Sequence, residues 1–438
     1  MLTNTIDFIS LGCSKNLVDT ERIMHQLSEC GYKVRFEPSR VSAEIVVINT
    51  CAFIEDAQQE SIEMILKFAE RKRMGKLRRL YVMGCLSQRF LKELEVEIPE
   101  VDAYFGKFDY MNLLDALGCK KSDENGKKRI ITTPKHYAYL KISEGCNRTC
   151  SYCAIPLITG AYKSRPMEDI VEEARWLVSE GVSELIVIAQ DLTYYGVDLY
   201  KKQMIASLVE QLSDIEGVKW IRLHYAYPTQ FPYDLLRVMR ERDNVCKYLD
   251  LAFQHISDNM LTLMRRNISK QQTYDLIERI RREVPGIVLR TTLMVGHPGE
   301  TQEDFEELLQ FVRDVRFERL GAFAFSNEVG TYAHKHYKDD VPQHVKQERL
   351  DTLMALQDEI SMEIGAKRIG AVETIVVDRK ERGEEGIMCW GRSQYESPDV
   401  DDEIFICTED SRNVRIGKTY EMIISNYDED HIYTAIKI

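Results

Sequence analysis

Short apolar runs alternate with amphipathic stretches through the first part of the chain. The runs are predicted strands and cover Ile6–Gly12, Glu44–Thr50 and Arg79–Gly84. Helical periodicity follows each of them, at Leu17–Glu29, Glu55–Arg71 and Gln88–Leu94. Strand and helix units joined by short turns are typical of a parallel, doubly wound α/β sheet. Residues 1–118 are therefore predicted to form one such domain.

The same alternation returns after residue 136 with longer units. Predicted strands are Tyr137–Ile142, Glu184–Ala189, Trp220–His224, Tyr248–Phe253, Val288–Val295 and Leu320–Phe325. Predicted helices between them are Met167–Glu180, Met204–Leu212, Tyr233–Arg240, Lys270–Glu283 and Gln302–Val315. Repeated β/α units of this kind predict a partial (β/α)6 barrel over residues 137–366, with its chemistry at the carboxyl ends of the strands.

A different pattern follows the long charged helix predicted at Gln343–Ile364. Short alternating runs lie at Ala371–Arg379, Ile387–Trp390, Glu403–Thr408, Thr419–Asn426 and Ile432–Ile436. They predict a small antiparallel β-barrel resembling the oligonucleotide-binding fold over residues 367–438. Residues 119–136 are polar and contain glycine, so we predict a linker there, with a possible hairpin tip.

The net charge, the apolar runs and the number of cysteines limit the classes of protein to which the chain can belong. The 438 residues carry a net charge of −13, whereas binding to nucleic-acid phosphates normally needs a basic face, so a basic partner or none is expected. The N-terminus lacks a signal-peptide pattern and no apolar run approaches the ~20 residues of a membrane span, so we expect a soluble, cytoplasmic protein. Eleven cysteines in such a chain favour metal or redox chemistry over a disulfide scaffold.

The densest group of these cysteines is Cys146, Cys150 and Cys153, which follow an apolar strand. A CxxxCxxC loop supplies three thiolates to a cubic 4Fe-4S cluster and leaves one iron open for a further ligand. The alternative is structural zinc with a distant fourth ligand. The cluster is favoured because the loop opens an α/β repeat instead of a small zinc finger.

A second group comes from the N-terminal domain, where Cys13, Cys51 and Cys85 each end a predicted strand. Any one of them alone is more often a small buried apolar residue. Parallel strands, however, open their carboxyl ends on one edge of the sheet, so the three thiols are predicted to converge on a second three-cysteine site.

Polar residues also end the predicted barrel strands. They are Gln190 and Asp191, His224 and Tyr225, Gln254 and His255, and the segment Gly296–Glu300. Each position taken alone is equally well explained as an ordinary loop residue. As a group they are predicted to line the mouth of the barrel.

Together, the six cysteines and the small C-terminal barrel resemble the methylthiotransferase branch of radical SAM enzymes over essentially the whole chain. Tyr152, just before the third loop cysteine, fits the same pattern. The resemblance implies two 4Fe-4S clusters: an auxiliary cluster on the N-terminal cysteines and one on the loop cysteines that cleaves S-adenosylmethionine (SAM). It also implies a TRAM domain that recognises substrate, and we predict that Tyr152, Gln190 and Asp191 contact the cofactor.

Two branches of this family differ in substrate. Members that act on tRNA adenosine typically begin Gly-Cys-Gln-Met-Asn and carry a basic TRAM domain. This chain instead has Gly12-Cys-Ser-Lys-Asn16, Leu223-His-Tyr-Ala-Tyr-Pro228, and Gly391-Arg-Ser before an acidic stretch. It is therefore similar to members that add a methylthio group to the β-carbon of an aspartate in ribosomal protein uS12.

That resemblance implies uS12 as a partner, an electron donor such as flavodoxin or ferredoxin, a sulfur donor, and no tRNA. Residues 366–438 contain 16 acidic and 10 basic residues, which suit either a solvated surface or a face that docks a cationic protein segment. We predict docking by Asp399, Asp401 and Asp402. The alternatives are a tRNA methylthiotransferase and a non-enzymatic iron-sulfur or RNA-binding protein.

Overall fold

A five-stranded parallel sheet forms the first domain of the computed structural model, which describes residues 2–119, 128–383, 386–408 and 411–437. Its strand order is β2-β1-β3-β4-β5. The strands are β1 (Leu2–Ser10), β2 (Lys33–Phe36), β3 (Ala43–Thr50), β4 (Arg79–Gly84) and β5 (Ala103–Gly106). The sequence pattern missed β2 and β5, which are edge strands of four residues each and too short to show alternation.

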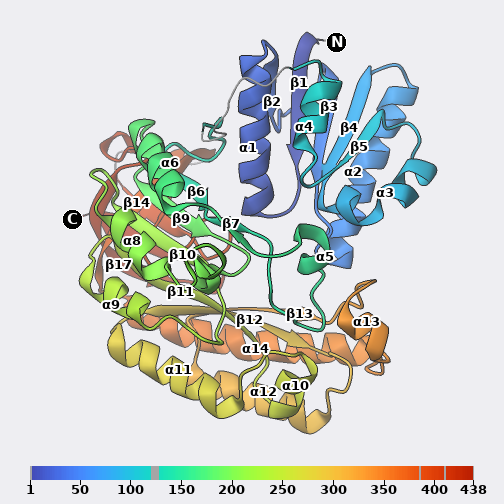
Figure 1. Ribbon diagram of the computed structural model, residues 1–438. Helices are drawn as coiled ribbons and strands as arrows, with labels where there is room; N and C mark the ends of the chain where they lie inside the picture. The colour runs from blue at the N-terminus through green and yellow to red at the C-terminus, as the bar shows by residue number, and fades with distance from the viewer. Residues whose placement is uncertain (1, 120–127, 384–385, 409–410, 438) are drawn as a thin grey trace.

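Helices cover both faces of this sheet (Figure 1). The helices α1 (Ser14–Glu29) and α4 (Tyr110–Ala116) pack on one face, and α2 (Glu55–Arg73) and α3 (Cys85–Glu97) pack on the other. Almost every residue of the central strand β3 is buried, as expected for a strand covered on both sides. The doubly wound architecture is thereby confirmed.

The second domain is a six-stranded parallel sheet curved into a partial barrel, in the order β13-β12-β11-β10-β9-β6. Its strands are β6 (Tyr137–Lys141), β9 (Glu184–Ile188), β10 (Trp220–Ala226), β11 (Val245–Gln254), β12 (Val288–Val295) and β13 (Arg319–Ala324). All six predicted strands are present, each within three residues at its ends. Their long apolar runs made them easy to predict because buried parallel strands need such runs.

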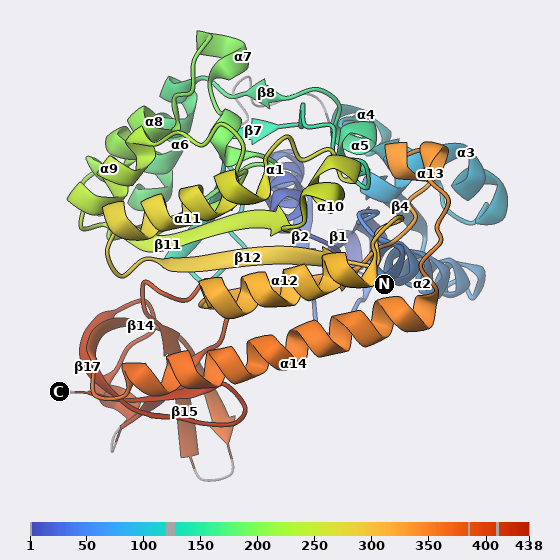
Figure 2. The ribbon, with the colours of Figure 1, turned by 90° about the horizontal axis from the view of Figure 1, so that it is seen from below.

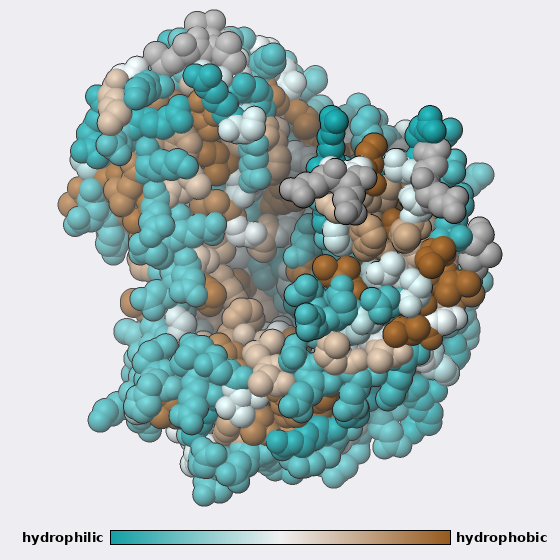
Figure 3. All heavy atoms as spheres, turned by 180° about the vertical axis from the view of Figure 1, so that it is seen from behind, coloured by the Kyte–Doolittle hydropathy of each residue, from teal (hydrophilic) through white to brown (hydrophobic). Residues whose placement is uncertain are grey.

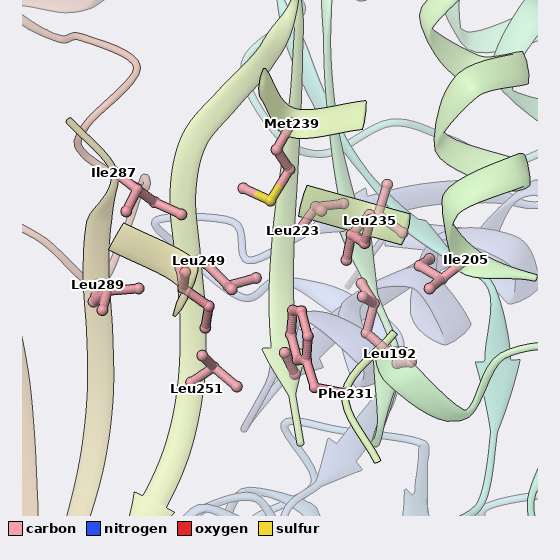
Figure 4. Close-up of a cluster of buried hydrophobic side chains, with 14 of the residues drawn as sticks. Leu192, Ile205, Leu223, Phe231, Leu235, Met239, Leu249, Leu251, Ile287 and Leu289 are labelled. Atoms are coloured by element: carbon pink, nitrogen blue, oxygen red, sulfur yellow. The ribbon is translucent and has the colours of Figure 1, made fainter. Parts of the chain in front are cut away.

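The longer helices of this domain cover the outer side of the barrel, and the shorter ones lie in its connections. The helices are α5 (Ile155–Thr159), α6 (Met167–Ser179), α7 (Val197–Tyr200), α8 (Ile205–Ser213), α9 (Asp234–Glu241), α10 (Asp258–Leu263), α11 (Lys270–Glu283), α12 (Gln302–Val315) and α13 (Tyr332–His336). Figure 4 shows strand residues such as Leu223 and Leu249 packing against helix residues such as Leu235. None of the helices in the described ranges is both long and apolar enough to cross a membrane.

The last domain is a closed β-barrel that follows the long helix α14 (Gln343–Arg368) (Figure 2). Its strands are β14 (Val372–Gly383), β15 (Gly386–Arg392), β16 (Ile404–Cys407), β17 (Thr419–Tyr427) and β18 (Tyr433–Lys437). The predicted antiparallel barrel is confirmed, with one parallel pair between β16 and β18. The helix α14 lies against α12 and β13 and so joins this barrel to the central domain.

Residues 392–402, which we call the closing segment, leave the last barrel and cover the amino-terminal ends of the central strands. Arg222 of β10 donates hydrogen bonds to the carbonyl oxygens of Ser393 and Gln394, at 3.3 and 2.7 Å. Glu396 is completely buried and pairs with Arg319 of β13 and with Arg368. The closing segment thus supplies carbonyl groups and a carboxylate to arginines that are buried at the bottom of the barrel.

This arrangement corrects the predicted docking role of the acidic stretch. The side chain of Asp401 is only 2% exposed and lies 3.6 Å from Arg290 of β12, so it is not available to a partner. Asp402 pairs with Arg319 at 2.6 Å. Docking is therefore wrong for Asp401, and Asp402 is committed to an internal ion pair. Only Asp399 is exposed, and it stays a docking candidate.

The linker predicted at 119–136 is only partly described, since residues 120–127 lie outside the described ranges. Its second half is anchored and does not behave as a free connection. Arg129 is fully buried and pairs with Glu21 of α1 and Glu173 of α6. A disulfide between Cys30 and Cys119 ties the end of α1 to the start of the linker. The first two domains are therefore fastened to each other along α1.

The buried ion pairs of Glu396 predict a pH-dependent stability. Burial acts to raise the pKa of Glu396, but the charges of Arg368 and Arg319 lower it to about 2. This pKa is below the value near 4.3 that the carboxyl has in the unfolded chain. The contribution of ionised Glu396 to the free energy of unfolding is therefore complete above about pH 4.3 and is lost as the pH falls toward 2. We expect Glu396→Gln to lower the free energy of unfolding by about 3 kcal/mol at pH 7, measured by urea unfolding.

The matched control for this substitution is Glu403→Gln, which removes an exposed carboxylate that is paired with Arg379. An exposed pair contributes less than about 1 kcal/mol, so this variant should unfold close to the wild type. Equal losses in the two variants would contradict a special role for the closing segment.

Candidate functional site

The cysteine loop begins directly after β6 and the short strand β7 (Ser143–Glu144), which pairs with β8 (Lys163–Ser164). Gly145 has a φ of +78°, and a Cβ there would lie 2.1 Å from the carbonyl oxygen of Ala161. Only glycine fits such a close backbone approach. The backbone N–H of Cys146 then donates to the carbonyl of Gly160 at 3.1 Å. These contacts fix the start of the loop at the carboxyl end of the barrel.

The middle of the loop is pinned by other barrel segments. The Ser151 hydroxyl lies 2.9 Å from Nε2 of His297, and its carbonyl accepts from the N–H of Ala333. Its N–H donates to the carbonyl of Met264. Three separate connections of the barrel therefore hold one residue of the loop, so the positions of Cys150 and Cys153 are set by the fold.

Two arginines bring positive charge to the loop thiols. Nη1 of Arg266 lies 3.3 Å from Sγ of Cys150 and 3.2 Å from the hydroxyl of Tyr152. Arg266 is 2% exposed and makes no ion pair with a carboxylate among the described residues. A buried cation needs a compensating charge, and an anionic cluster bound at Cys150 would supply it. This chemistry suits an anionic cluster.

The second arginine, Arg148, links the loop to the next strand. It donates from Nε to Asp191 at 2.7 Å, and its backbone N–H lies 3.4 Å from Sγ of Cys146. The other oxygen of Asp191 accepts from the backbone and hydroxyl of Thr193. Asp191 is thus placed beside the loop, where it orients Arg148. Gln190 is half-buried, and the contacts of Gln190, Asp191 and Tyr152 with a cofactor stay predictions.

The three N-terminal cysteines are also brought together. Gly12 has a φ of +95°, and a Cβ there would lie 2.9 Å from Sγ of Cys51. Burial is the main cause that raises the pKa of Cys85 to about 12, and the nearby charges of Cys13 and Cys51 add to it. The thiol of Cys85 also lies 3.6 Å from Oδ1 of Asn16. The convergence expected at one edge of the sheet is what the structure shows.

The two cysteine groups meet across the interface between the domains. Ala154 and Ile158, which follow Cys153, belong to the same apolar cluster as Cys85 and Leu86 of α3. Nearby, Arg89 of α3 pairs with Glu328 of the barrel at 2.8 Å, and both side chains are almost fully buried. Apolar packing and a buried ion pair therefore hold the segment after Cys153 against the helix that begins at Cys85.

A cavity of about 480 Å³ lies beside this interface, between α1 and the strands β6 to β8. Figure 3 shows that the molecular surface is hollowed between the two lobes. Burial acts to raise the pKa of Asp19 in this cavity, but the charges of Lys107 and Lys141 keep it well below its usual range. Lys107 also lies 3.4 Å from Oδ1 of Asn16, which contacts Cys85. Charged groups of both domains therefore surround the N-terminal thiols.

The donor set fits iron-sulfur clusters. Thiolates that each bind a different iron of a cubane stand farther apart than the ligands of one ion. The described residues contain no group of three His, Cys, Asp or Glu side chains spaced to hold a single metal ion. Each group offers three thiols in a largely buried setting with basic residues nearby, so either could hold a three-thiolate cluster.

Sequence reasoning found the six cysteines but missed the residues that support them. Arg266 and Lys107 lie in loops without a distinctive spacing, and Arg148 is one of the variable positions between Cys146 and Cys150, so no signal in a single sequence marks them. Asn16 was visible only as part of a motif. Their roles depend on contacts between segments that are far apart along the chain.

Comparison with known proteins agrees with the division of the chain into three domains. Residues 140–312 match the radical SAM superfamily, residues 5–106 match an uncharacterized protein family, UPF0004, and residues 369–436 match the TRAM domain. The chain is 61% identical to the ribosomal protein uS12 methylthiotransferase RimO of Parabacteroides distasonis over 406 residues, which is 93% of each chain. It is 58% identical to that of Bacteroides thetaiotaomicron over 436 residues, covering 100% of this chain and 99% of the relative.

The chain belongs to the RimO family. A more distant relative, the RimO of Cytophaga hutchinsonii, is 47% identical over 98% of this chain and 97% of its own. Among solved structures, the radical SAM methyltransferase TsrM of Kitasatospora setae aligns with a TM-score of 0.53 over 74% of this chain and 72% of its own. At 13% identity this likeness shows the fold alone. Membership in the RimO family implies the use of SAM and 4Fe-4S clusters.

The buried thiols predict slow alkylation in the metal-free, reduced protein. Burial raises the pKa of Cys146 to about 11 and that of Cys85 to about 12. At pH 8 less than about one in a thousand of these thiols is then a thiolate, against roughly a quarter of an ordinary one. We expect iodoacetamide to modify both at least 100-fold more slowly than exposed Cys407, as measured by mass spectrometry. Equal rates at the three positions would contradict the described burial.

Proposed function

We propose that this chain is a radical SAM methylthiotransferase that adds a methylthio group to the β-carbon of an aspartate in ribosomal protein uS12. The observation that carries the proposal is that the segment following Cys153 and the segment of Cys85 share one apolar cluster, with Ala154 and Cys85 among its members. Relatives that are 58–61% identical and named as uS12 methylthiotransferases support it. The reaction requires both groups because hydrogen removal and sulfur delivery act on the same carbon.

In this proposal Cys146, Cys150 and Cys153 hold one 4Fe-4S cluster, and the N-terminal cysteines hold a second. Bound there, the first cluster would supply the electron that cleaves SAM for hydrogen-atom removal, the second would present the sulfur, and a second SAM would supply the methyl group. No side-chain base removes a proton from an unactivated carbon at neutral pH, which is why the fold provides cofactor sites instead of a general base.

The chain itself supplies position and charge. Arg266 places its guanidinium against the thiol of Cys150, and the backbone N–H of Arg148 points at Sγ of Cys146 while the guanidinium of Arg148 pairs with Asp191. The buried pair of Arg89 and Glu328 holds the two domains in register. Apolar packing between α5 and α3 excludes water from the space beside the cysteines.

The substrate and setting follow from the same proposal. We infer a cytoplasmic enzyme that receives electrons from a carrier such as flavodoxin or ferredoxin, and sulfur from a separate donor. Exposed Asp399 remains a candidate contact for the basic uS12. The tRNA-modifying alternative is not favoured by the relatives described above, which bear the uS12 name.

Loss of one N-terminal thiol should separate the two half-reactions. In Cys13→Ala we expect no methylthiolated uS12, because the auxiliary cluster loses a ligand, while the reduced enzyme still converts SAM to 5'-deoxyadenosine and methionine. Iron content should fall from about eight toward four atoms per chain, as expected for the loss of one cubane. Product analysis by mass spectrometry and iron assay measure these outcomes.

The matched control is Cys407→Ala, which removes an exposed thiol from the C-terminal barrel. It should retain the full iron content and the full yield of modified uS12. Full methylthiolation by Cys13→Ala would refute the assignment of the auxiliary site.

Deletion of the gene tests the substrate directly. We expect uS12 from the deletion strain to lack the mass of one methylthio group, while the modified adenosines of bulk tRNA are unchanged. Liquid chromatography with mass spectrometry of both pools gives the answer. Loss of the tRNA modification with normal uS12 would assign the chain to the other branch of the family.

A further inference from the structure

The first turn of α1 is inserted into the open side of the central barrel. Val18 on this turn is completely buried, and it packs against Tyr137, Tyr139, Ile186 and Ile188 on the strands β6 and β9. The N-terminal domain therefore contributes side chains to the interior of the barrel. One of them is a lysine that none of the contacts described so far explains.

Lys15 lies on the same turn and is 5% exposed. Its Nζ lies 3.0 Å from the centre of the Tyr225 ring. Within the described ranges Lys15 makes no hydrogen bond or ion pair. By contrast, buried Lys107 and Lys141 at the same interface both pair with Asp19.

A buried ammonium without an anionic partner is costly, because it has lost its hydration and a tyrosine face restores only part of the lost stabilisation. Folded proteins keep such groups at sites where a ligand completes the pairing. The ammonium of Lys15 is not sealed in by hydrogen-bond acceptors, so it can pair with an anion that enters the barrel mouth.

The position of Lys15 indicates which anion that is. Lys15 is two residues from Cys13, a proposed ligand of the auxiliary cluster. Tyr225 is two residues from Tyr227, whose hydroxyl lies 3.6 Å from Sγ of Cys150. The contact of Lys15 with Tyr225 therefore joins the segment that follows Cys13 to the strand end that leads to Tyr227 and Cys150.

We propose that Lys15 binds the side-chain carboxylate of the substrate aspartate and so positions its β-carbon between the two cysteine groups. This inference rests on the proposed function, in which the reacting carbon is bonded directly to that carboxylate. A single charge-assisted hydrogen bond from Lys15 to the carboxylate then also positions the β-carbon, because the two groups are joined by one covalent bond. It also makes Lys15 a residue that selects an aspartate over a neutral side chain.

The test compares binding of two protein probes to the full-length, cluster-loaded enzyme under anaerobic conditions. One probe is purified uS12, and the other is uS12 with its target aspartate replaced by asparagine. We expect the wild-type enzyme to bind the first about 10–100-fold more tightly, as is typical of a hydrogen bond between charged groups. In Lys15→Met, which keeps the length of the side chain against Tyr225, we expect the two affinities to be equal.

Two further variants keep the result interpretable. Lys15→Arg retains the charge and should retain most of the preference, whereas Lys33→Met removes an exposed lysine of the same domain and should retain all of it. Iron content and thermal unfolding report whether each variant is folded. If Lys15→Met fails to fold, Lys15→Gln takes its place, with the same expected loss of preference.

A folded Lys15→Met enzyme that keeps the preference for aspartate overturns the proposal. SAM also carries a carboxylate, so SAM affinity is measured in each variant. A loss of SAM affinity with the aspartate preference intact would assign Lys15 to SAM and likewise overturn the proposal. A wild-type enzyme that neither binds nor modifies uS12 is a different result, since it refutes the proposed function itself.

Discussion

The contact between the first turn of α1 and the mouth of the central barrel is the constraint on which the site depends. Each three-cysteine group is held by its own domain, and neither can bring the other close. The register between them is set by apolar packing around Val18 and Ala154 and by buried ion pairs such as that of Arg89 with Glu328. A small shift at this interface would change the separation of the two groups without altering either one.

The basic side chains at this interface differ in whether they have a carboxylate partner, and this difference explains many of the buried polar contacts. Arginines and lysines from both domains lie along the interface, and most are neutralised by Asp19, Glu21, Glu173 or Glu328. In the part of the chain that the structure describes, Arg266 and Lys15 have no carboxylate partner, and they face the places where anionic groups are expected. The basic side chains that the fold leaves without a carboxylate thus indicate where anionic ligands bind.

The sequence predicted the architecture of the three sheets well, because long apolar strands are local signals, whereas the role of the six cysteines as ligands stays a prediction. It failed for Asp401 and Asp402, which looked like a solvent-facing acidic surface. Their partners Arg290 and Arg319 lie more than 80 residues away, so the neutralisation could not be read from composition. Lys15, Arg148 and Arg266 were likewise invisible as functional candidates because their neighbours come from distant segments.

The closing segment changes how the C-terminal domain should be regarded. Arg222 and Arg319 on the central strands complete their hydrogen bonds and ion pairs with residues 392–402. The last barrel is therefore not an independent module that could be exchanged between enzymes of different substrate preference. In a chimera, the closing segment of the foreign C-terminal domain would not match the arginines at the amino-terminal ends of the central strands. Substitutions in one of the two domains therefore require compensating substitutions in the other.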